Sequence, residues 1–299
     1  MAPRSFNYRL SSVRGFHYKV IVAMLTEAIF LSLILASCTT SKFSGVYLIS
    51  LYYSPADPFK ANSTDSALAA ILVNLAGNQT SLQVRAGYMG VCASLPFGDW
   101  TCSTQASSVA SVLRYVTMQA SASNVSSDPL NLIGIAQKFK DEVVFDELLF
   151  ISLTFGVLEF LHVVTIPLWY SNQAPRDSEG GRNRVPAFAA RRVSRTTLVL
   201  LGISALMTCL TVFWQHLSSA AAIAVSKRMT AGVVKGHVGS VSMGLGWAAV
   251  FLNFSIFLAV FILERTIRPP SLPPIHSVNC LYLSALFSPD TFFNLFKAT

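Results

Sequence analysis

Charged residues are scarce in this sequence. Only 12% of its 299 residues are Asp, Glu, Lys or Arg, and 53% are hydrophobic. Soluble domains carry about 25% charged residues, so the composition argues against a soluble protein and indicates a membrane protein. The net charge is +8, but the basic residues lie in short segments beside apolar runs and form no stripe with interleaved aromatic residues. We therefore expect no nucleic-acid partner.

Signatures of enzymes and metal sites are missing as well. We find no phosphate-binding glycine loop, no nucleophile elbow and no EF-hand spacing. The five histidines are isolated from cysteine and from one another, and segment 39–147 contains none. We expect no enzymatic activity, no cofactor and no metal site.

Four apolar segments are long enough to span a bilayer, which needs about 20 mostly apolar residues per helix. They are residues 20–38, 148–169, 197–214 and 238–263. An Ala-rich run at 220–225 is too short to span. The predicted fold is an all-α membrane bundle of four transmembrane helices.

Basic flanks orient these spans. The tail 1–19, the loop 170–196 and the tail 264–299 carry Arg or Lys clusters, and four spans place all three on one side. The positive-inside rule makes that side cytoplasmic. Segment 39–147 and the short loop 215–237 should then lie outside, although Lys227, Arg228 and Lys235 fit that side poorly.

Glycosylation motifs agree with this orientation. Asn62, Asn78 and Asn124 each begin an Asn-X-Ser/Thr motif, and all three lie in segment 39–147. Glycans are attached on the lumenal side, so we expect a glycoprotein with both termini in the cytoplasm. A similar motif at Asn253 lies inside the fourth span and should stay unmodified.

The first span has a second interpretation as a cleaved signal peptide, because "LILASC" resembles a lipoprotein cleavage box. Its length and the acidic Glu27 argue against cleavage.

The stretch "GYMGVCASLPFGDWTC" (87–102) dominates the outside segment. Thiols outside the cell meet an oxidising compartment, so we expect a disulfide between Cys92 and Cys102. Trp100 should cover the bond with apolar area. The bond is either a structural staple alone or part of a recognition loop.

Around this stretch the pattern predicts a small α+β cap. Segments 44–54 and 81–95 are β-branched and aromatic, which is typical of strands. Segments 65–76 and 103–120 have helical spacing, and a helix within 128–150 should lead into the second span.

Three ionisable residues lie within the spans: Glu27, Glu159 and His162. Glu159 and His162 share one helix face, and Glu27 lies at a similar depth. Such residues either line a cation or proton path or fix the packing of the bundle.

Small residues recur every four positions before and within the fourth span. They are Gly232, Gly236, Ser240, Gly244 and Ala248. The spacing predicts one helix face for close packing, either inside the bundle or between subunits.

Acidic residues gather before the second span, at Asp141, Glu142, Asp146 and Glu147. Their helical spacing spreads them around the axis. They form either a ring of solvated acidic side chains or a site that attracts calcium weakly at the start of the second span.

The four spans, the large outside loop and the motif Gly-aromatic-X-Gly-X-Cys resemble the claudin-type architecture. The motif residues are Gly87, Gly90 and Cys92, followed by Trp100 and Cys102. Tyr88 and Met89 stand where claudins have their motif tryptophan, which is a departure from true claudins.

A narrower resemblance is to the fungal family of calcium-influx regulators and membrane-fusion proteins of mating and tip growth. It rests on "VRAGYMGVC", "DWTC" and the preceding "VYLISLYYS". The resemblance implies a plasma-membrane protein that promotes low-affinity calcium influx and cell fusion. The implied partners are the lipid bilayer, calcium-channel or fusion proteins, and a second copy of the chain. The alternative is a claudin-like adhesion or membrane-organising protein without an ion role, and a third hypothesis is a channel or transporter subunit.

Overall fold

The computed structural model describes residues 4–53, 71, 82–94, 98–120, 128–171, 191–230 and 232–267. Its elements are α1 (Arg4–Leu35), β1 (Ile49–Tyr53), β2 (Gln83–Ala86), β3 (Val91–Ser94), β4 (Trp100–Ser103), α3 (Ala106–Ala120), α4 (Leu132–Lys138), α5 (Asp146–Ser171), α6 (Arg191–Met229), β5 (Val234–Val238) and α7 (Ser240–Ile267). The structure also contains a 3-10 turn (Ser41–Phe43) and a π-helical turn (Phe139–Val143). Asn62, Asn78, Asn124 and most of the expected helix 65–76 lie outside the described residues.

The chain forms two compact units. The membrane unit comprises residues 1–29, 151–209 and 248–299, and the cap unit comprises residues 30–150 and 210–247. Each is described separately below.

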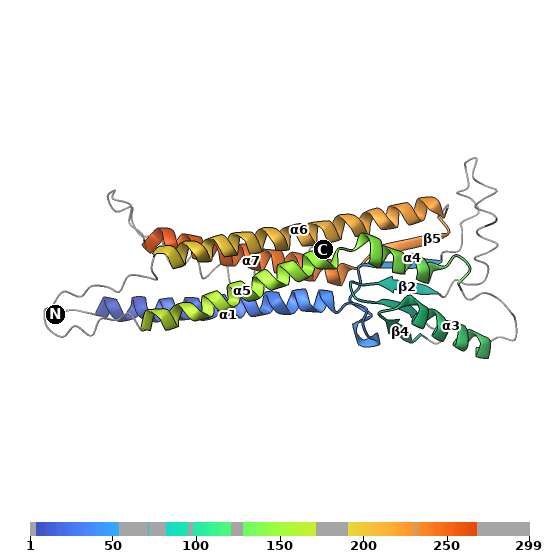
Figure 1. Ribbon diagram of the computed structural model, residues 1–299, viewed down its shortest axis with the longest axis horizontal. Helices are drawn as coiled ribbons and strands as arrows, with labels where there is room; N and C mark the ends of the chain where they lie inside the picture. The colour runs from blue at the N-terminus through green and yellow to red at the C-terminus, as the bar shows by residue number, and fades with distance from the viewer. Residues whose placement is uncertain are drawn as a thin grey trace. The chain divides into compact units, whose positions relative to one another are not determined.

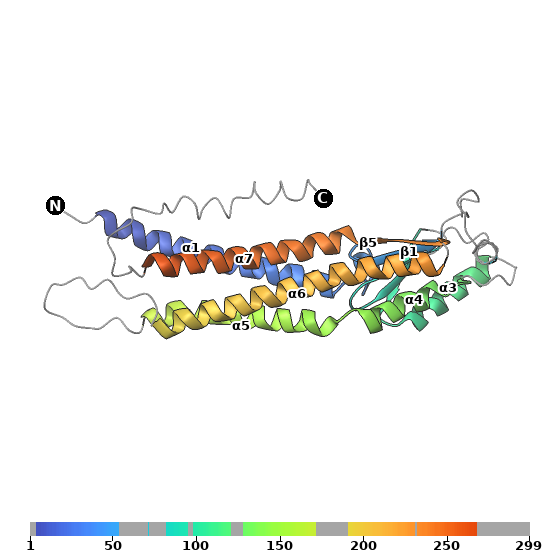
Figure 2. The same ribbon diagram turned by 90° about the horizontal axis from the view of Figure 1, so that it is seen from above.

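The membrane unit contains parts of the four long helices α1, α5, α6 and α7 (Figures 1 and 2). Each has a stretch long and apolar enough to cross a bilayer: His17–Leu35, Asp146–Thr165, Arg195–Met229 and Ser240–Ile262. Val163, Leu201 and Ile256 join α1 side chains in one buried core. The prediction of four membrane-spanning helices is confirmed.

The outward surface of these helices is apolar. Leu161 on α5 is 53% exposed, Leu206 on α6 is 67% exposed, and Leu258 on α7 is 45% exposed. Leucine exposed at this level on three helices is expected where lipid tails, rather than water, surround the chain.

The cap unit is built on a five-stranded antiparallel sheet in the order β4-β3-β2-β1-β5 (Figure 1). Strand alternation buries Ile49, Leu51, Val84, Val91 and Ala93 on one face. Helices α3 and α4 pack against the sheet, which gives the small α+β cap that the sequence predicts.

The region after the third span differs from its prediction. Residues 215–237 were expected to form a short outside loop, but α6 continues to Met229 and β5 follows directly. No Gly or Pro interrupts residues 215–229, so nothing in the sequence ends the helix there. Strand β5 pairs with β1, Ile49 opposite Val238 and Tyr53 opposite Val234, and so belongs to the cap sheet.

The predicted helical ladder of small residues is therefore wrong at its first two members. Gly232 lies in a turn with φ +83°, and Gly236 lies in β5. A Cβ at Gly236 would lie 2.8 Å from the Ser50 carbonyl oxygen, so this glycine permits close strand approach. Ser240, Gly244 and Ala248 are on α7.

The helix expected within 128–150 is interrupted. α4 passes into the π-helical turn, and Val144 adopts an extended conformation before α5 begins at Asp146. The Val144 amide donates to the Phe139 carbonyl, which closes the turn.

Candidate functional site

The motif glycines, Gly87 and Gly90, leave room for the backbone of Ser37 and Cys38, which follow α1. The Gly87 amide donates to the Gly90 carbonyl at 2.9 Å, and the Tyr88 amide donates to Ser37 Oγ at 2.7 Å. A Cβ at Gly87 would lie 2.5 Å from the Ser37 carbonyl oxygen, and one at Gly90 would collide with the Cys38 carbonyl. The motif thus joins the end of α1 to the β2–β3 turn.

The predicted disulfide between Cys92 and Cys102 is present. The two cysteines lie directly opposite each other on β3 and β4, with their Cα atoms 4.0 Å apart. Nearby Cys38 is a free, buried thiol. Burial raises the pKa of Cys38 to about 12, so it stays protonated and unreactive at neutral pH.

Trp100 contacts Arg85, and its packing over the disulfide stays a prediction. The Arg85 guanidinium lies 3.9 Å from the Trp100 ring centre and 4.6 Å from that of Tyr47. Arg85 Nη1 donates to the Ser44 carbonyl at 2.9 Å. This cation–π stack ties β2 and β4 to the segment before β1.

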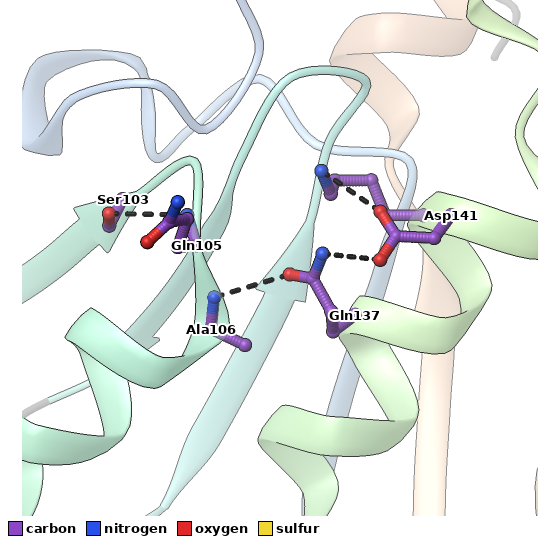
Figure 3. A network of polar contacts seen from close by, with 6 residues as sticks. Ser103, Gln105, Ala106, Gln137 and Asp141 are labelled. Carbon is purple, nitrogen blue, oxygen red and sulfur yellow. Dashed lines mark hydrogen bonds and ion pairs between the residues drawn. The ribbon is translucent and has the colours of Figure 1, made fainter.

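The acidic residues before the second span line a cavity of about 290 Å³ together with Tyr88. Gln137 on α4 accepts from the Ala106 amide and donates to Asp141 at 2.6 Å, which links α3 to the cavity edge (Figure 3). Slight burial opposes ionisation of Asp141, but hydrogen bonds from Gln137 and Lys140 and the Lys140 charge hold its pKa below the usual value. The cavity is therefore anionic, with one acid paired to Lys140 at 3.1 Å.

A second polar cluster lies inside the membrane unit. Asn253 on α7 donates from Nδ2 to Glu27 Oε1 at 2.7 Å, to Ser204 Oγ at 3.1 Å and to Thr208 Oγ1 at 3.3 Å. Glu159 on α5 lies beside Ser204 and so belongs to the same cluster. We call this set, together with Ser152, the four-helix cluster, since α1, α5, α6 and α7 all contribute to it.

Burial in the four-helix cluster is nearly complete. Glu27 is 6% exposed, Glu159 is 3% exposed, and Asn253 is 1% exposed. Ser152 Oγ and Thr208 Oγ1 lie 2.8 Å apart and are also buried. Within the described ranges, no group of three or more His, Cys, Asp or Glu residues is arranged to hold a metal.

The structure brings Glu27 and Glu159 into one cluster but leaves out His162. The Nε2 atom of His162 is buried and has no hydrogen-bond partner among the described residues. His162 Nε2 therefore forms no hydrogen bond with Glu159. Both carboxylates instead reach the hydroxyls of α6.

Sequence reasoning missed Asn253 and the polar face of α6. Asn253 was considered only as a glycosylation motif, although an amide inside an apolar span is itself a signal for function or packing. Buried polar residues recur along α6 at steps of three or four, a helical period that was detectable. They are Ser204, Thr208, Thr211, Gln215 and Ser219.

A comparison with protein-family models gives one match, to "Ca2+ regulator and membrane fusion protein Fig1", over residues 68–266. This range contains the glycine motif, the disulfide and three of the four spans. No curated protein and no solved structure matches the chain. The match covers more than half of the sequence, and the chain therefore belongs to the Fig1 family of Ca²⁺ regulators and membrane fusion proteins.

Proposed function

We propose that this protein is a non-enzymatic regulator of low-affinity calcium influx and membrane fusion during mating or polarised growth. The observation that carries the proposal is the family match across residues 68–266. The cap unit works outside the plasma membrane, and both termini lie in the cytoplasm.

The side assignment has physical support. A disulfide such as Cys92–Cys102 persists in an oxidising compartment and is rare in the cytosol. The basic loop 170–196 follows the second span in the sequence, and the positive-inside rule favours the cytoplasm for such a loop. Glycans on Asn62, Asn78 and Asn124 would agree with this topology.

The claudin-like architecture is part of the proposal. It rests on the Gly87–Cys92 motif and on the four spans. A claudin-like adhesion protein without an ion role is the competing function. Calcium-channel or fusion proteins, and a second copy of the chain, are the proposed protein partners.

Cells that lack the chain separate the two functions. We expect calcium uptake and cell fusion both to fall in such cells and to recover when the intact chain is returned. Unchanged calcium uptake combined with failed cell contact would establish the adhesion function instead. The purified chain in liposomes then distinguishes a pore, which passes calcium alone, from a regulator, which does not.

Single Asn→Gln substitutions at positions 62, 78 and 124 test the topology. Each should remove one glycosidase-sensitive step in gel mobility, because only outside asparagines carry glycans. Protease protection of segment 39–147 by an intact plasma membrane would overturn the assignment.

A further inference from the structure

The two faces of the cap sheet carry different kinds of side chain. Leu51 and Val84 are buried on the face against which α3 and α4 pack. Strand alternation directs the side chains between them to the opposite face. On β5, which lies at one edge of the sheet, Lys235 and His237 belong to this opposite face and are exposed. Part of the opposite face is therefore available to a partner.

Aromatic rings and one guanidinium form a continuous surface on this opposite face. The Arg85 guanidinium lies over the rings of Trp100 and Tyr47. The Tyr47 hydroxyl and His237 Nε2 are hydrogen-bonded at 2.8 Å, and the ring centres of Tyr52 and His237 lie 6.1 Å apart. We call these five residues the aromatic face. Trp, Tyr and Arg are the residue types that most often carry the binding energy of protein interfaces.

The aromatic face is positively charged, and the sheet does not balance that charge. Lys235 lies directly opposite Tyr52 in the strand register and adds a second cation beside Arg85. No Asp or Glu is present among the described strand residues on this side of the sheet. Within the described part of the chain, Arg85 forms no ion pair, and its buried Nε has no hydrogen-bond partner. A partner should therefore supply carboxylates, because interfaces bring complementary charges together.

The anionic cavity of the cap offers such carboxylates. Its lining contains four acidic side chains and one basic side chain, Lys140. Glu142 and Glu147 are exposed there, and Phe145 adds an apolar side chain that is 47% exposed. The cavity follows the end of α4, which packs on the side of the sheet away from the aromatic face. One cap therefore cannot bring its own two surfaces together.

Opposite charge and shared aromatic character favour contact between two copies of the chain. Two different surfaces that complement each other form a heterologous interface, which joins copies head to tail. We propose that the aromatic face of one cap binds the anionic cavity of the cap of a second copy. A dimer formed in this way keeps one unused face and one unused cavity, so further copies can add.

This inference deepens the proposed function, because it assigns surfaces to one of the proposed partners, a second copy of the chain, and it rests on the proposed function only for that partner. Association is measured on the purified chain, whereas calcium uptake and fusion are measured in cells. A monomeric chain can still regulate influx, and an associating chain can lack any effect on influx. Either proposal can therefore fail while the other stands.

Light scattering during size-exclusion chromatography provides the test, because it gives the protein mass of the full-length chain in detergent micelles. The wild-type mass should rise from monomer to dimer and beyond as the protein concentration increases. NaCl at about 1 M should shift association to higher protein concentration, because the Debye length falls to roughly 3 Å. A wild type that stays monomeric at every concentration would overturn the proposal and leave the aromatic face to a different partner.

Two charge reversals locate the interface. Lys235→Glu changes the aromatic side and Glu142→Lys changes the cavity, and each variant alone should stay monomeric, because like charges would then meet. An equal mixture should form dimers again, since one variant keeps an intact face and the other an intact cavity. If Glu142→Lys alone associates like the wild type, the cavity is not the partner surface and the proposal is wrong. A mixture that stays monomeric, although both variants keep the wild-type Tm, would also overturn it.

Arg114→Glu is the matched control. It reverses a charge at an exposed position on α3, which packs on the other side of the sheet, and it should associate like the wild type. Loss of association in this variant would show an effect of net charge alone and would contradict the proposed surfaces.

Lys235→Gln and Glu142→Gln cover the case in which a charge reversal prevents folding. Each removes one charge without reversing it, so the concentration of half-association should rise about fivefold. An unchanged concentration in either variant would overturn the proposed interface.

Discussion

The cap unit and the membrane unit both bury apolar side chains, but they differ in their buried acids and in their outer surfaces. The cap sheet buries Leu51, Val84 and Val91. The membrane unit buries Leu201 and Ile256 together with Glu27 and Glu159, and it exposes leucines on its outer surface. In water the hydrophobic effect drives apolar residues inward. Between helices in lipid that force is absent, and polar contacts and close packing hold the helices together. The medium around each unit therefore decides which residues its outer surface can expose.

Both units contain buried polar atoms without a hydrogen-bond partner among the described residues; in the cap these are Arg85 Nε, Gln215 Nε2 and Ser219 Oγ. In the cap, the Asp128 carboxylate accepts from the Tyr53 hydroxyl at 2.8 Å and from the Leu132 and Ile133 amides. In the membrane unit, Asn253 Oδ1 and His162 Nε2 have no partner among the described residues. The Asp128 network therefore stabilises the cap, and neither unit satisfies all of its buried polar groups.

The largest expected effect on stability comes from removing the Cys92–Cys102 disulfide of the cap. Cys92→Ser or Cys102→Ser should destabilise the cap by about 3 kcal/mol, because the bond closes a short loop in the unfolded chain. The two variants should show equal loss of surface delivery, and the double variant should be no worse. Surface biotinylation measures delivery. A clearly milder defect in one single variant would show that the two cysteines are not paired in the cell.

Gly90→Ala tests the close backbone contact of the cap. The added Cβ would meet the Cys38 carbonyl, so we expect a loss of about 1–3 kcal/mol from overpacking. Gly45→Ala is the matched control, since a Cβ there meets nothing within 4 Å. Chemical denaturation monitored by cap-specific hydrogen exchange measures both. Equal stability of the two variants would contradict the tight joint between α1 and the motif turn.

Two leucine-to-alanine substitutions test whether lipid, rather than water, surrounds the membrane unit. Leu51 is 1% exposed in the cap, and Leu201 is 0% exposed in the membrane unit. Leu51→Ala should cost about 2 kcal/mol more than Leu201→Ala, because only the cap loses transfer free energy from water, at roughly 0.8 kcal/mol per CH₂. Hydrogen exchange measured by mass spectrometry on peptides from each unit compares them. Equal costs would contradict a lipid environment for α6.

Tyr53→Phe removes two hydrogen bonds, one to the Asp128 carboxylate and one from the Leu130 amide, and should cost about 1 kcal/mol for each. Burial raises the pKa of Tyr53, so its contribution to cap stability is complete below the unfolded pKa of about 10 and is lost as pH rises above it. The alkaline loss of stability, followed by near-UV circular dichroism, should therefore shrink in Tyr53→Phe. Burial also raises the pKa of Tyr88, so this residue should contribute to the alkaline loss that persists in the variant. An identical alkaline profile would contradict this role of Tyr53.

Much of the cap was predictable from local pattern. The strands around Gly87–Gly90, the helix near 106–120 and the disulfide follow from alternation, helical spacing and compartment chemistry. Strand β5 was not predicted, since it pairs with β1 across more than 180 residues of chain. The alternation in "VKGHV" is only a weak indication of a strand, because this segment forms a strand by pairing with β1.

The sequence by itself determined the class of this protein, because long apolar runs and scarce charge permit few structures other than membrane-spanning helices. It also determined which residues within the spans are ionisable. Only the tertiary structure decided that Glu27, Glu159 and Asn253, from three helices, share one cluster, and that Trp100 stacks on Arg85. Those contacts depend on helix rotation and strand register, which long-range packing sets and local sequence does not encode.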